Sequence, residues 1–413
     1  MRPRTERSPA RVARSVTVTA DAGATVPAGA PGGRRAPGPR RGDRGRRARG
    51  GRRVRGHGRA EQPRSRRRPR RSCDRPTRDR PVVRAGAARS DAPADRAGEE
   101  VGDDPVREPI TLAFGGDVHA AGFLAGRLAA EGPAMLGPLA PMLAPADLAI
   151  VNLETAITDR GEPAPKEFNF RADPALLQAL VDAGVDVASV ANNHGLDYGV
   201  DGLVDTIDAG RRAGLALVGI GRDDTEAWRP WIGDVGGWTV AVLGATQVLD
   251  SSLIRSWTAT PDQPGLASAK DEDRLVAEVA AARAQADTVV VFLHWGIEGH
   301  TCPSATQRSL ADRLVAAGAD IIVGGHAHRV QAAGRKGGAV VGYGLGNFVF
   351  AAPSPSGATS GVLTVTVAGR DVLDHRWTPA RLRNGVADRL EGPEADRALA
   401  EWEALADCAD LDP

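Results

Sequence analysis

Carboxylate, amide and imidazole side chains follow five successive apolar runs in this chain. Five of its eight histidines lie at these positions. Open α/β sheets place their sites at the carboxyl ends of strands, so we expect these side chains to gather in one place. In chain order they are Asp117 and His119; Asn152 and Glu154; Asn192, Asn193 and His194; His294; and His326 and His328.

This combination of side chains predicts a site for two divalent cations. Carboxylates can bridge two metals, and imidazole suits zinc, manganese or iron. Asp117 with His119, and His326 with His328, are two residues apart, so on extended chain each pair would point the same way. Two metals about 3.5–4 Å apart would activate a hydroxide for attack on a phosphoryl group. His194 is the candidate proton donor to the leaving oxygen.

Any one of these histidines alone would more often be a hydrogen-bonded core residue. A Gly-His-x-His sequence, as at Gly325–His328, also occurs by chance, and Glu154 alone would suit the first turn of a helix. The prediction of a metal site therefore depends on the whole set at consecutive strand ends.

Lys166 and Arg171 are charged residues beside the predicted site. They flank Phe168 and Phe170, and predict either binding of an anionic substrate or an ordinary solvated loop. Four further polar residues are assigned to substrate contact or its support: Asn152, Asn192, Asp197 and Asn347.

Two of those polar residues have alternative interpretations. Asp197 would orient the His194 imidazole or cap the helix predicted over Val200–Ala213. Asn347 would reach the site or cap a turn.

From residue 110 onward, strand and helix patterns alternate, which predicts an α/β fold. The helical stretches have apolar residues at spacings of three and four, and Gly184, Gly214 and Gly318 mark their ends. The predicted strands are Ile110–Phe114, Leu148–Val151, Val185–Val190, Val240–Leu243, Val289–Leu293 and Ile321–Val323. The predicted helices are Pro174–Ala183, Asp201–Ala213, Asp271–Ala286 and Ala305–Ala317.

The last predicted strands, Val340–Tyr343, Phe348–Phe350 and Val362–Val367, lack intervening helices. They predict an antiparallel finish, as in a second sheet packed on the first. We place the α/β domain at residues 109–385 and a helical tail at residues 386–413.

Residues 1–108 differ in composition from the rest of the chain. The first ninety residues hold 28 arginines and six acidic residues, a net charge of +22. The remaining 25 basic and 46 acidic residues give −21. The segment has almost no apolar periodicity, which predicts disorder. It is either a basic arm for an anionic surface or an inert extension; no aromatic is interleaved to stack on bases, which disfavours nucleic acid.

Cysteine and hydropathy patterns bear on the compartment. Three cysteines, Cys73, Cys302 and Cys408, do not predict a disulfide framework and give no sign of an oxidising compartment. No apolar run reaches the ~20 residues of a membrane-spanning helix. The first residues also lack the apolar segment of a secretory signal. The sequence as written therefore predicts a cytoplasmic protein.

Several phrases resemble the CapA, or poly-γ-glutamate capsule synthesis, family of the calcineurin-like metallophosphoesterase superfamily. The ordered set spans most of residues 110–350. The phrases are Asp117-Val118-His119, Asn152-Leu153-Glu154-Thr155, Phe168-Asn169-Phe170, Ala191-Asn192-Asn193-His194-Gly195-Leu196-Asp197-Tyr198-Gly199, His294-Trp295-Gly296-Ile297-Glu298, Gly325-His326-Ala327-His328 and Tyr343-Gly344-Leu345-Gly346-Asn347-Phe348.

The resemblance implies a four-layer α/β/β/α sandwich and a role in making or anchoring an extracellular polymer. It implies two divalent metal ions (Mn, Zn or Fe), with Asp117 as one bridging ligand. Glu154 is the second bridging carboxylate, with Asn152 as the substitute. It also implies metal binding by His119, Asn193, His294, His326 and His328, with His194 as the catalytic residue.

Some phrases depart from the family pattern. Gly325-His326-Ala327-His328 replaces the usual Gly-His-His-Pro-His, and Gly344 replaces a common serine. The family is often membrane-anchored or extracytoplasmic, and the anchor is not evident here.

The sequence thus predicts a metal-dependent, phosphoesterase-like hydrolase acting on a small or polymeric anionic substrate. The alternative is a non-catalytic component of polymer assembly or export that retains the fold. Capsule-synthesis proteins are the implied partners, and no transmembrane segment is expected.

Overall fold

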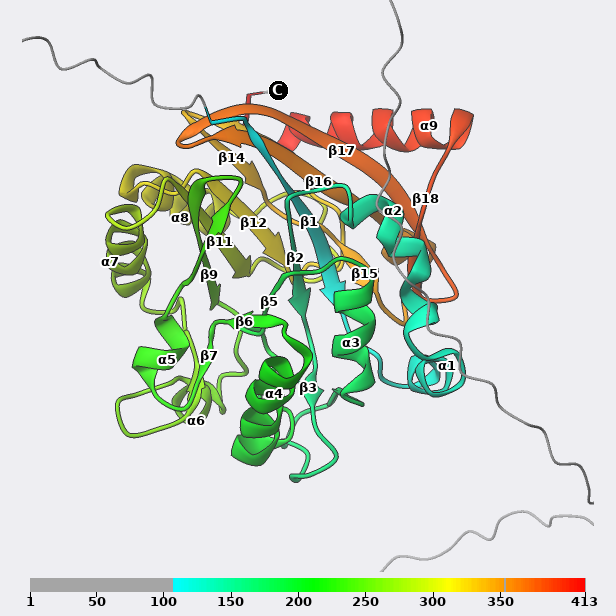
Figure 1. The fold of residues 1–413 in the computed structure, drawn as a ribbon, viewed down its shortest axis with the longest axis vertical. Helices are drawn as coiled ribbons and strands as arrows, with labels where there is room; N and C mark the ends of the chain where they lie inside the picture. Colours follow the sequence, from blue (N-terminus) through cyan, green and yellow to red (C-terminus); the bar gives the residue numbers. More distant parts are fainter. Residues whose placement is uncertain (1–106, 353, 413) are drawn as a thin grey trace, which may run out of the picture. The chain divides into compact units, whose positions relative to one another are not determined.

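The computed structural model describes residues 107–352 and 354–412, which form two β-sheets with helices packed on them (Figure 1). The predicted basic arm or inert extension lies outside the described residues, apart from its last two positions. In the described part of the chain, no helix has the length and hydropathy needed to cross a membrane.

The first sheet has eight strands and contains both ends of the domain. Its parallel half carries the first candidate ligands, and its antiparallel half comes from the end of the chain. In spatial order the strands are β15 (Asn347–Val349), β18 (Val386–Arg389), β17 (Asp371–Arg383), β16 (Thr359–Ala368), β1 (Ile110–Val118), β2 (Leu148–Leu153), β5 (Val187–Ser189) and β6 (Ala216–Val218).

The second sheet has six strands, of which the central four are parallel and the two edge strands antiparallel. In spatial order they are β13 (Ala333–Lys336), β14 (Ala339–Gly342), β12 (Ile321–Gly325), β11 (Thr288–His294), β9 (Trp238–Thr246) and β8 (Trp231–Val235). Two small pairs accompany the sheets: β3 (Ala156–Ile157) with β4 (Arg171–Ala172), and β7 (Ile220–Gly221) with β10 (Gly265–Leu266).

Helices cover the outer faces of both sheets (Figure 1). The α-helices are α1 (Phe123–Glu131), α2 (Ala140–Leu143), α3 (Ala175–Asp182), α4 (Gly199–Ala213), α5 (Asp224–Trp228), α6 (Ile254–Trp257), α7 (Glu272–Arg283), α8 (Ala305–Ala317) and α9 (Gly392–Glu403). Short 3₁₀ segments are η1 (Gly132–Leu139), η2 (Pro355–Ala358) and η3 (Ala404–Cys408).

Alternation along the strands creates three apolar layers. On β11, Val290 and Phe292 face the other sheet, while Val289, Val291 and Leu293 pack under α7 and α8. The strands β1, β2 and β5 divide their side chains in the same way between the inter-sheet layer and the layer under α1, α3 and α4. Buried on both faces, these strands read as continuous apolar runs rather than as alternating patterns. The result is the four-layer α/β/β/α sandwich that the resemblance implies.

Every strand predicted between residues 110 and 323 forms, and so do the four predicted helices. Gly214 and Gly318 adopt left-handed conformations at the ends of α4 and α8, as predicted. A capping box between Ser304 and Gln307 begins α8.

The predicted antiparallel finish is only partly correct. β16, β17 and β18 are antiparallel to one another, but β14 is parallel to β12 and β15 is parallel to β1. These late strands extend the two existing sheets and do not form a new one. β14 pairs with β12 in one sheet, and β16 pairs with β1 in the other. The segment predicted as a helical tail begins with the strand β18 before α9 and η3.

The C-terminal segment ties the two sheets together. Trp402 of α9 stacks on Trp377 of β17, with ring centroids 5.7 Å apart. Further along, Asp410 accepts a hydrogen bond from the hydroxyl of Tyr343 (2.8 Å), beyond β14. A disulfide joins Cys408 to Cys302, 106 residues away, with 5.6 Å between the Cα atoms.

This bridge corrects the sequence-based expectation about the cysteines. Their number and spacing predict no disulfide, because only the packing of α9 and η3 brings Cys408 to the loop before α8. Cys73 lies outside the described residues.

We predict that Cys408→Ser destabilises the domain by about 2–5 kcal/mol, because the bridge restricts a long loop in the unfolded chain. The measurement is urea unfolding under non-reducing conditions. Wild-type protein in dithiothreitol and the Cys302→Ser/Cys408→Ser double variant should match the single variant. Identical unfolding midpoints for oxidised wild type and Cys408→Ser would contradict the prediction.

Candidate metal centre

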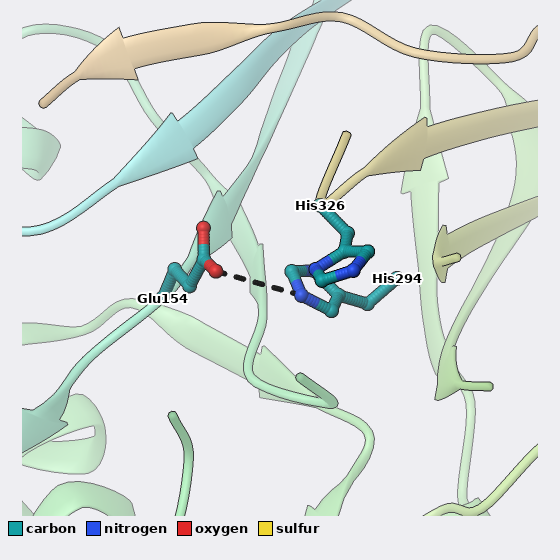
Figure 2. A group of neighbouring side chains, drawn as sticks. All are labelled: Glu154, His294 and His326. Carbon is teal, nitrogen blue, oxygen red and sulfur yellow. Dashed lines mark ion pairs between the residues drawn. The ribbon is translucent and has the colours of Figure 1, made fainter. Parts of the chain in front are cut away.

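The strands of both sheets deliver the candidate ligands to one place. Asp117 lies at the end of β1 and Glu154 just after β2, both in the eight-stranded sheet. His294 ends β11, and His326 and His328 follow β12, in the six-stranded sheet. Figure 2 shows the His294 and His326 rings beside the Glu154 carboxylate. The centre is therefore built across the interface between the two sheets.

Two groups of possible ligands share Glu154. The first contains Glu154, His294 and His326, and the second contains Asp117, Glu154 and His328. In each group the ligand atoms lie within 4.8 Å of one another. His294 Nε2 is 3.5 Å from Glu154 Oε1, and His328 Nδ1 is 3.2 Å from Asp117 Oδ2. The Glu154 carboxylate is thus a candidate ligand in both groups.

The Glu154 carboxylate is fully buried. Neither of its oxygens has a hydrogen-bond partner within the part of the chain that the structure describes, and His326 Nδ1 is in the same condition. Burial, with a contribution from Asp117, raises the pKa of Glu154 well above its usual range. A buried charge without a partner is costly in a protein. The donor set therefore fits divalent cations, which would supply the missing partner.

The histidines of the centre differ in protonation. Burial lowers the pKa of His294 well below its ordinary value and that of His326 to about 4. Both are therefore neutral at pH 7, the form that binds metals. Burial opposes protonation of His328 too, but the carboxylates of Glu154 and Asp117 outweigh it and raise the pKa of His328 to about 9.

The segment after β12 has an unusual backbone. His326 has φ 88° and His328 has φ 50°, both in the left-handed region that non-glycine residues rarely adopt. The prediction of extended chain here is therefore wrong, and the two histidines belong to different groups. A Cβ on Gly325 would lie 2.2 Å from Asp117 Oδ1, so only glycine fits. Such strain is found where a site requires it.

Two buried asparagines support the ligands from behind. Asn152 Nδ2 donates to Asp117 Oδ1 (2.8 Å) and lies 3.1 Å from His294 Nδ1. Asn192 Nδ2 in turn donates to Asn152 Oδ1 (3.0 Å). Both side chains are fully buried. Predicted as substrate contacts, they are in a position to orient the candidate ligands.

Asn193 and Asn347 each contact one histidine of the centre. Asn193 Oδ1 accepts from His294 Nε2 (2.8 Å), which places it beside the first group. Asn347 Oδ1 is 2.9 Å from His328 Nδ1, and its amide donates to the Gly357 carbonyl (2.8 Å). Asn347 therefore reaches the site through a ligand.

His119 lies apart from both groups. Its Nδ1 accepts from the backbone N–H of Ala121 (3.0 Å), and its Nε2 faces the N–H of Ala351 (3.3 Å). Its ring stacks on Phe170 at 4.4 Å and meets Phe350 edge-on at 4.2 Å. Burial, together with His194 and His328, lowers its pKa to about 3. That His119 binds a metal stays a prediction.

His194 is held by a carboxylate and an aromatic ring. Its Nδ1 is 2.6 Å from Asp197 Oδ2, and its ring stacks on Phe170 at 4.1 Å. Burial lowers its pKa, and Asp197 partly opposes this. Asp197 precedes α4, but its side chain does not cap that helix. Of the two roles predicted for Asp197, the structure therefore favours the contact with His194.

Lys166 and Arg171, predicted as a pair, lie in different surroundings. The Lys166 side chain is 8% exposed and forms an ion pair with Asp197 at 2.7 Å. Arg171 is exposed, with its guanidinium 4.6 Å from the centroid of the Tyr198 ring.

Sequence reasoning missed three features of the site. Phe350 lies 4.5 Å from the His328 ring, and Phe170 separates His119 from His194. Glu298 and Asp250 line a pocket together with Asn193 and His326. The sequence offered a signal for Glu298, because this residue lies four positions after His294. It offered no signal for Asp250, which follows a different strand.

The sequence matches the family described as Bacterial capsule synthesis protein PGA_cap over residues 111–352, more than half of the chain. The chain belongs to this family. The resemblance to the CapA family found in the sequence is thereby confirmed.

Curated relatives agree with this family membership. The chain is 38% identical over 193 residues to the capsule biosynthesis protein CapA of Bacillus anthracis, covering 46% of each protein. It is 35% identical to the PGA biosynthesis protein CapA of Bacillus subtilis, over 51% of this chain and 55% of that protein. A probable polyglutamine synthesis accessory protein of Mycobacterium tuberculosis is 33% identical, over 49% and 55%. The chain spans about half the length of these relatives.

Solved structures are more distant from this member of the PGA_cap family. A hypothetical protein from Thermus thermophilus has 17% identity and a TM-score of 0.40, over 66% of this chain and 100% of that one. A putative 5'-nucleotidase from Staphylococcus aureus has 16% identity and a TM-score of 0.41, over 72% and 58%.

We predict that binding of Mn²⁺ to the metal-free protein releases protons at pH 7. Glu154 and His328 both have raised pKa values and must lose their protons to bind a cation. Affinity should therefore rise with pH until about pH 9, where His328 is deprotonated in the free protein. Calorimetry in buffers of different ionisation enthalpy counts the protons.

The matched variant for this experiment is Glu154→Gln, which keeps the shape and removes one titrating group. It should release fewer protons and bind more weakly. Binding heats that are independent of the buffer would contradict the prediction.

Proposed function

We propose that this protein is a hydrolase that depends on two divalent metal ions and cleaves a phosphoester or a similar bond in an anionic substrate. The observation that carries the proposal is the buried Glu154 carboxylate, which has no hydrogen-bond partner within the described residues and is common to two ligand groups. A purely structural carboxylate would be hydrogen-bonded.

One ion would be held by Glu154, His294 and His326, with Asn193 beside them. The other would be held by Asp117, Glu154 and His328. These nitrogen and oxygen ligands suit Mn, Zn or Fe. When bound, the ions would supply Lewis-acid activation of the scissile group and of the attacking water.

The protein's own residues would position the ligands and manage a proton. Asn152 and Asn192 fix the orientation of Asp117 and His294 through their amide hydrogen bonds. Asp197 would hold one proton on His194 Nδ1 and favours the doubly protonated imidazole, against the effect of burial; the Nε2–H of that form would pass a proton to the leaving oxygen. Arg171, which is exposed, is free to attract an anionic substrate.

The family and its named relatives support a biological setting. The relatives are named for capsule, PGA or polyglutamine synthesis, and the last is called an accessory protein. We therefore propose that this chain acts in the synthesis of an extracellular anionic polymer. Its substrate would be the polymer or an intermediate of its synthesis, and capsule-synthesis proteins would be its partners.

We predict that the protein loaded with Mn²⁺ hydrolyses bis(p-nitrophenyl) phosphate. His194→Gln should lower kcat by about 10²–10⁴-fold, because it removes the proton donor. His326→Ala should bind less metal, measured by elemental analysis, and lose turnover. His375→Ala is the matched control, since His375 lies on β17 outside the centre.

A folded wild-type protein that binds no metal and shows no turnover would contradict this function. That result would favour the alternative of a non-catalytic component of polymer assembly or export.

The Cys302–Cys408 bridge supports an oxidising compartment, where such bonds form and persist. We propose this location in place of the cytoplasmic one expected from the sequence. Alkylation of free thiols in the producing bacterium, followed by mass spectrometry, should leave Cys302 and Cys408 unmodified unless a reductant is added first. Modification of both without reductant would contradict it.

A further inference from the structure

We propose that Lys166 is a positioning residue, which holds His194 and Asp197 in place and does not contact the substrate. The proposal rests on the proposed function for its kinetic test. For Lys166, it replaces both roles predicted from the sequence for Lys166 and Arg171, which are binding of an anionic substrate and an ordinary solvated loop.

The Lys166 ammonium group lies close to several polar protein atoms. It lies 2.7 Å from Asp197 Oδ1 and 3.3 Å from His194 Nδ1, and it donates to the backbone carbonyl of Asn193. The Asp197 carboxylate and the Asn193 carbonyl are acceptors for the ammonium, whereas the protonated His194 Nδ1 is only a close neighbour. The Trp257 ring lies 5.1 Å from the nitrogen. With 8% of the side chain exposed, little of this residue is open to a substrate.

Asp197 connects Lys166 to the imidazole. It is fully buried, and its two oxygens are divided between different partners. Oδ1 pairs with Lys166, while Oδ2 contacts His194 Nδ1 (2.6 Å) and accepts from the Phe170 N–H (2.6 Å). A buried carboxylate requires an opposite charge to stay ionised at low cost. Lys166 supplies this charge at Oδ1, the oxygen that does not contact the imidazole.

The segment from β3 to β4 packs against the segment that carries His194. Ala164 N–H donates to the Asp197 carbonyl (2.8 Å), and Phe170 stacks on the His194 ring. Lys166 lies between these two contacts in the chain. The segment thus fixes the imidazole plane through Phe170 and its Nδ1 partner through Lys166. The same ammonium holds the carbonyl of Asn193, whose side chain lies beside the first ligand group.

The two roles for Lys166 predict different kinetics. Loss of a substrate-binding cation raises KM for an anionic substrate. Loss of a positioning residue lowers kcat and leaves KM nearly unchanged, because the substrate is bound as before but the proton donor is misplaced.

The first test compares Lys166→Met with wild type, using the full chain loaded with Mn²⁺ and bis(p-nitrophenyl) phosphate. We expect kcat to fall by about 10–100-fold. KM should stay within about twofold of the wild-type value. The matched control is Lys270→Met, because Lys270 is exposed and outside the centre. A rise in KM with kcat unchanged would overturn the proposal.

A second variant covers the case in which Lys166→Met does not fold. Asp197→Asn breaks the same contact from its other side and should lower kcat in the same way. Where both variants fold, the double variant should lose little more than Asp197→Asn alone, because the two residues act through one contact. Fully additive losses would overturn the proposal.

A readout that needs no turnover separates this proposal from the proposed function. In metal-free protein with ¹⁵N-labelled histidine, the His194 Nδ1–H signal is assigned by its absence in His194→Gln. That proton should exchange with water faster in Lys166→Met than in wild type or Lys270→Met. Faster exchange in Lys166→Met, with no turnover by the wild type, would contradict the proposed hydrolase and support the positioning role. Unchanged exchange would overturn the positioning role.

Discussion

The burial of one carboxylate determines most of the architecture of the centre. Glu154 lies at the end of β2, with no hydrogen-bond partner for either oxygen within the described residues. An arrangement of this kind is unfavourable unless positive charge is supplied. The surrounding residues are suited to hold cations that would supply it: the neutral His294 and His326 form one group with Glu154, and His328 and Asp117 form the other. Their own burial lowers the pKa values of His294 and His326, while Glu154 and Asp117 raise that of His328.

Holding that carboxylate requires two sheets and a strained turn. Asp117 and Glu154 come from one sheet, and the three histidines come from the other. The sheets approach closely enough that Gly325 leaves no room for a side chain beside Asp117. Positive φ angles at His326 and His328 turn the two rings toward different groups. The apolar layer between the sheets supplies the rigidity that keeps this conformation.

Around the ligands, polar side chains form a supporting shell. Asn152 and Asn192 lie behind the ligands, and Lys166 with Asp197 lies behind His194. Supporting residues of this kind usually affect the metal affinity or activity of a site, because they fix the orientation of the residues that bind the metal. The C-terminal segment stabilises the same region from outside, since Cys408 is bonded to the loop that follows His294. The site and the stability of the domain are thus built from common elements.

The sequence by itself determined the strands, the helices and the types of ligand. Apolar runs followed by Asp117, Glu154, His294 and His326 are local signals, because a buried parallel strand and the residue after it are adjacent in the chain. Only the tertiary structure decided which ligands share a group, that His119 faces backbone amides, and that Lys166 is buried. It also decided the pairing of cysteines 106 residues apart. These outcomes depend on contacts between distant segments, which no local pattern encodes.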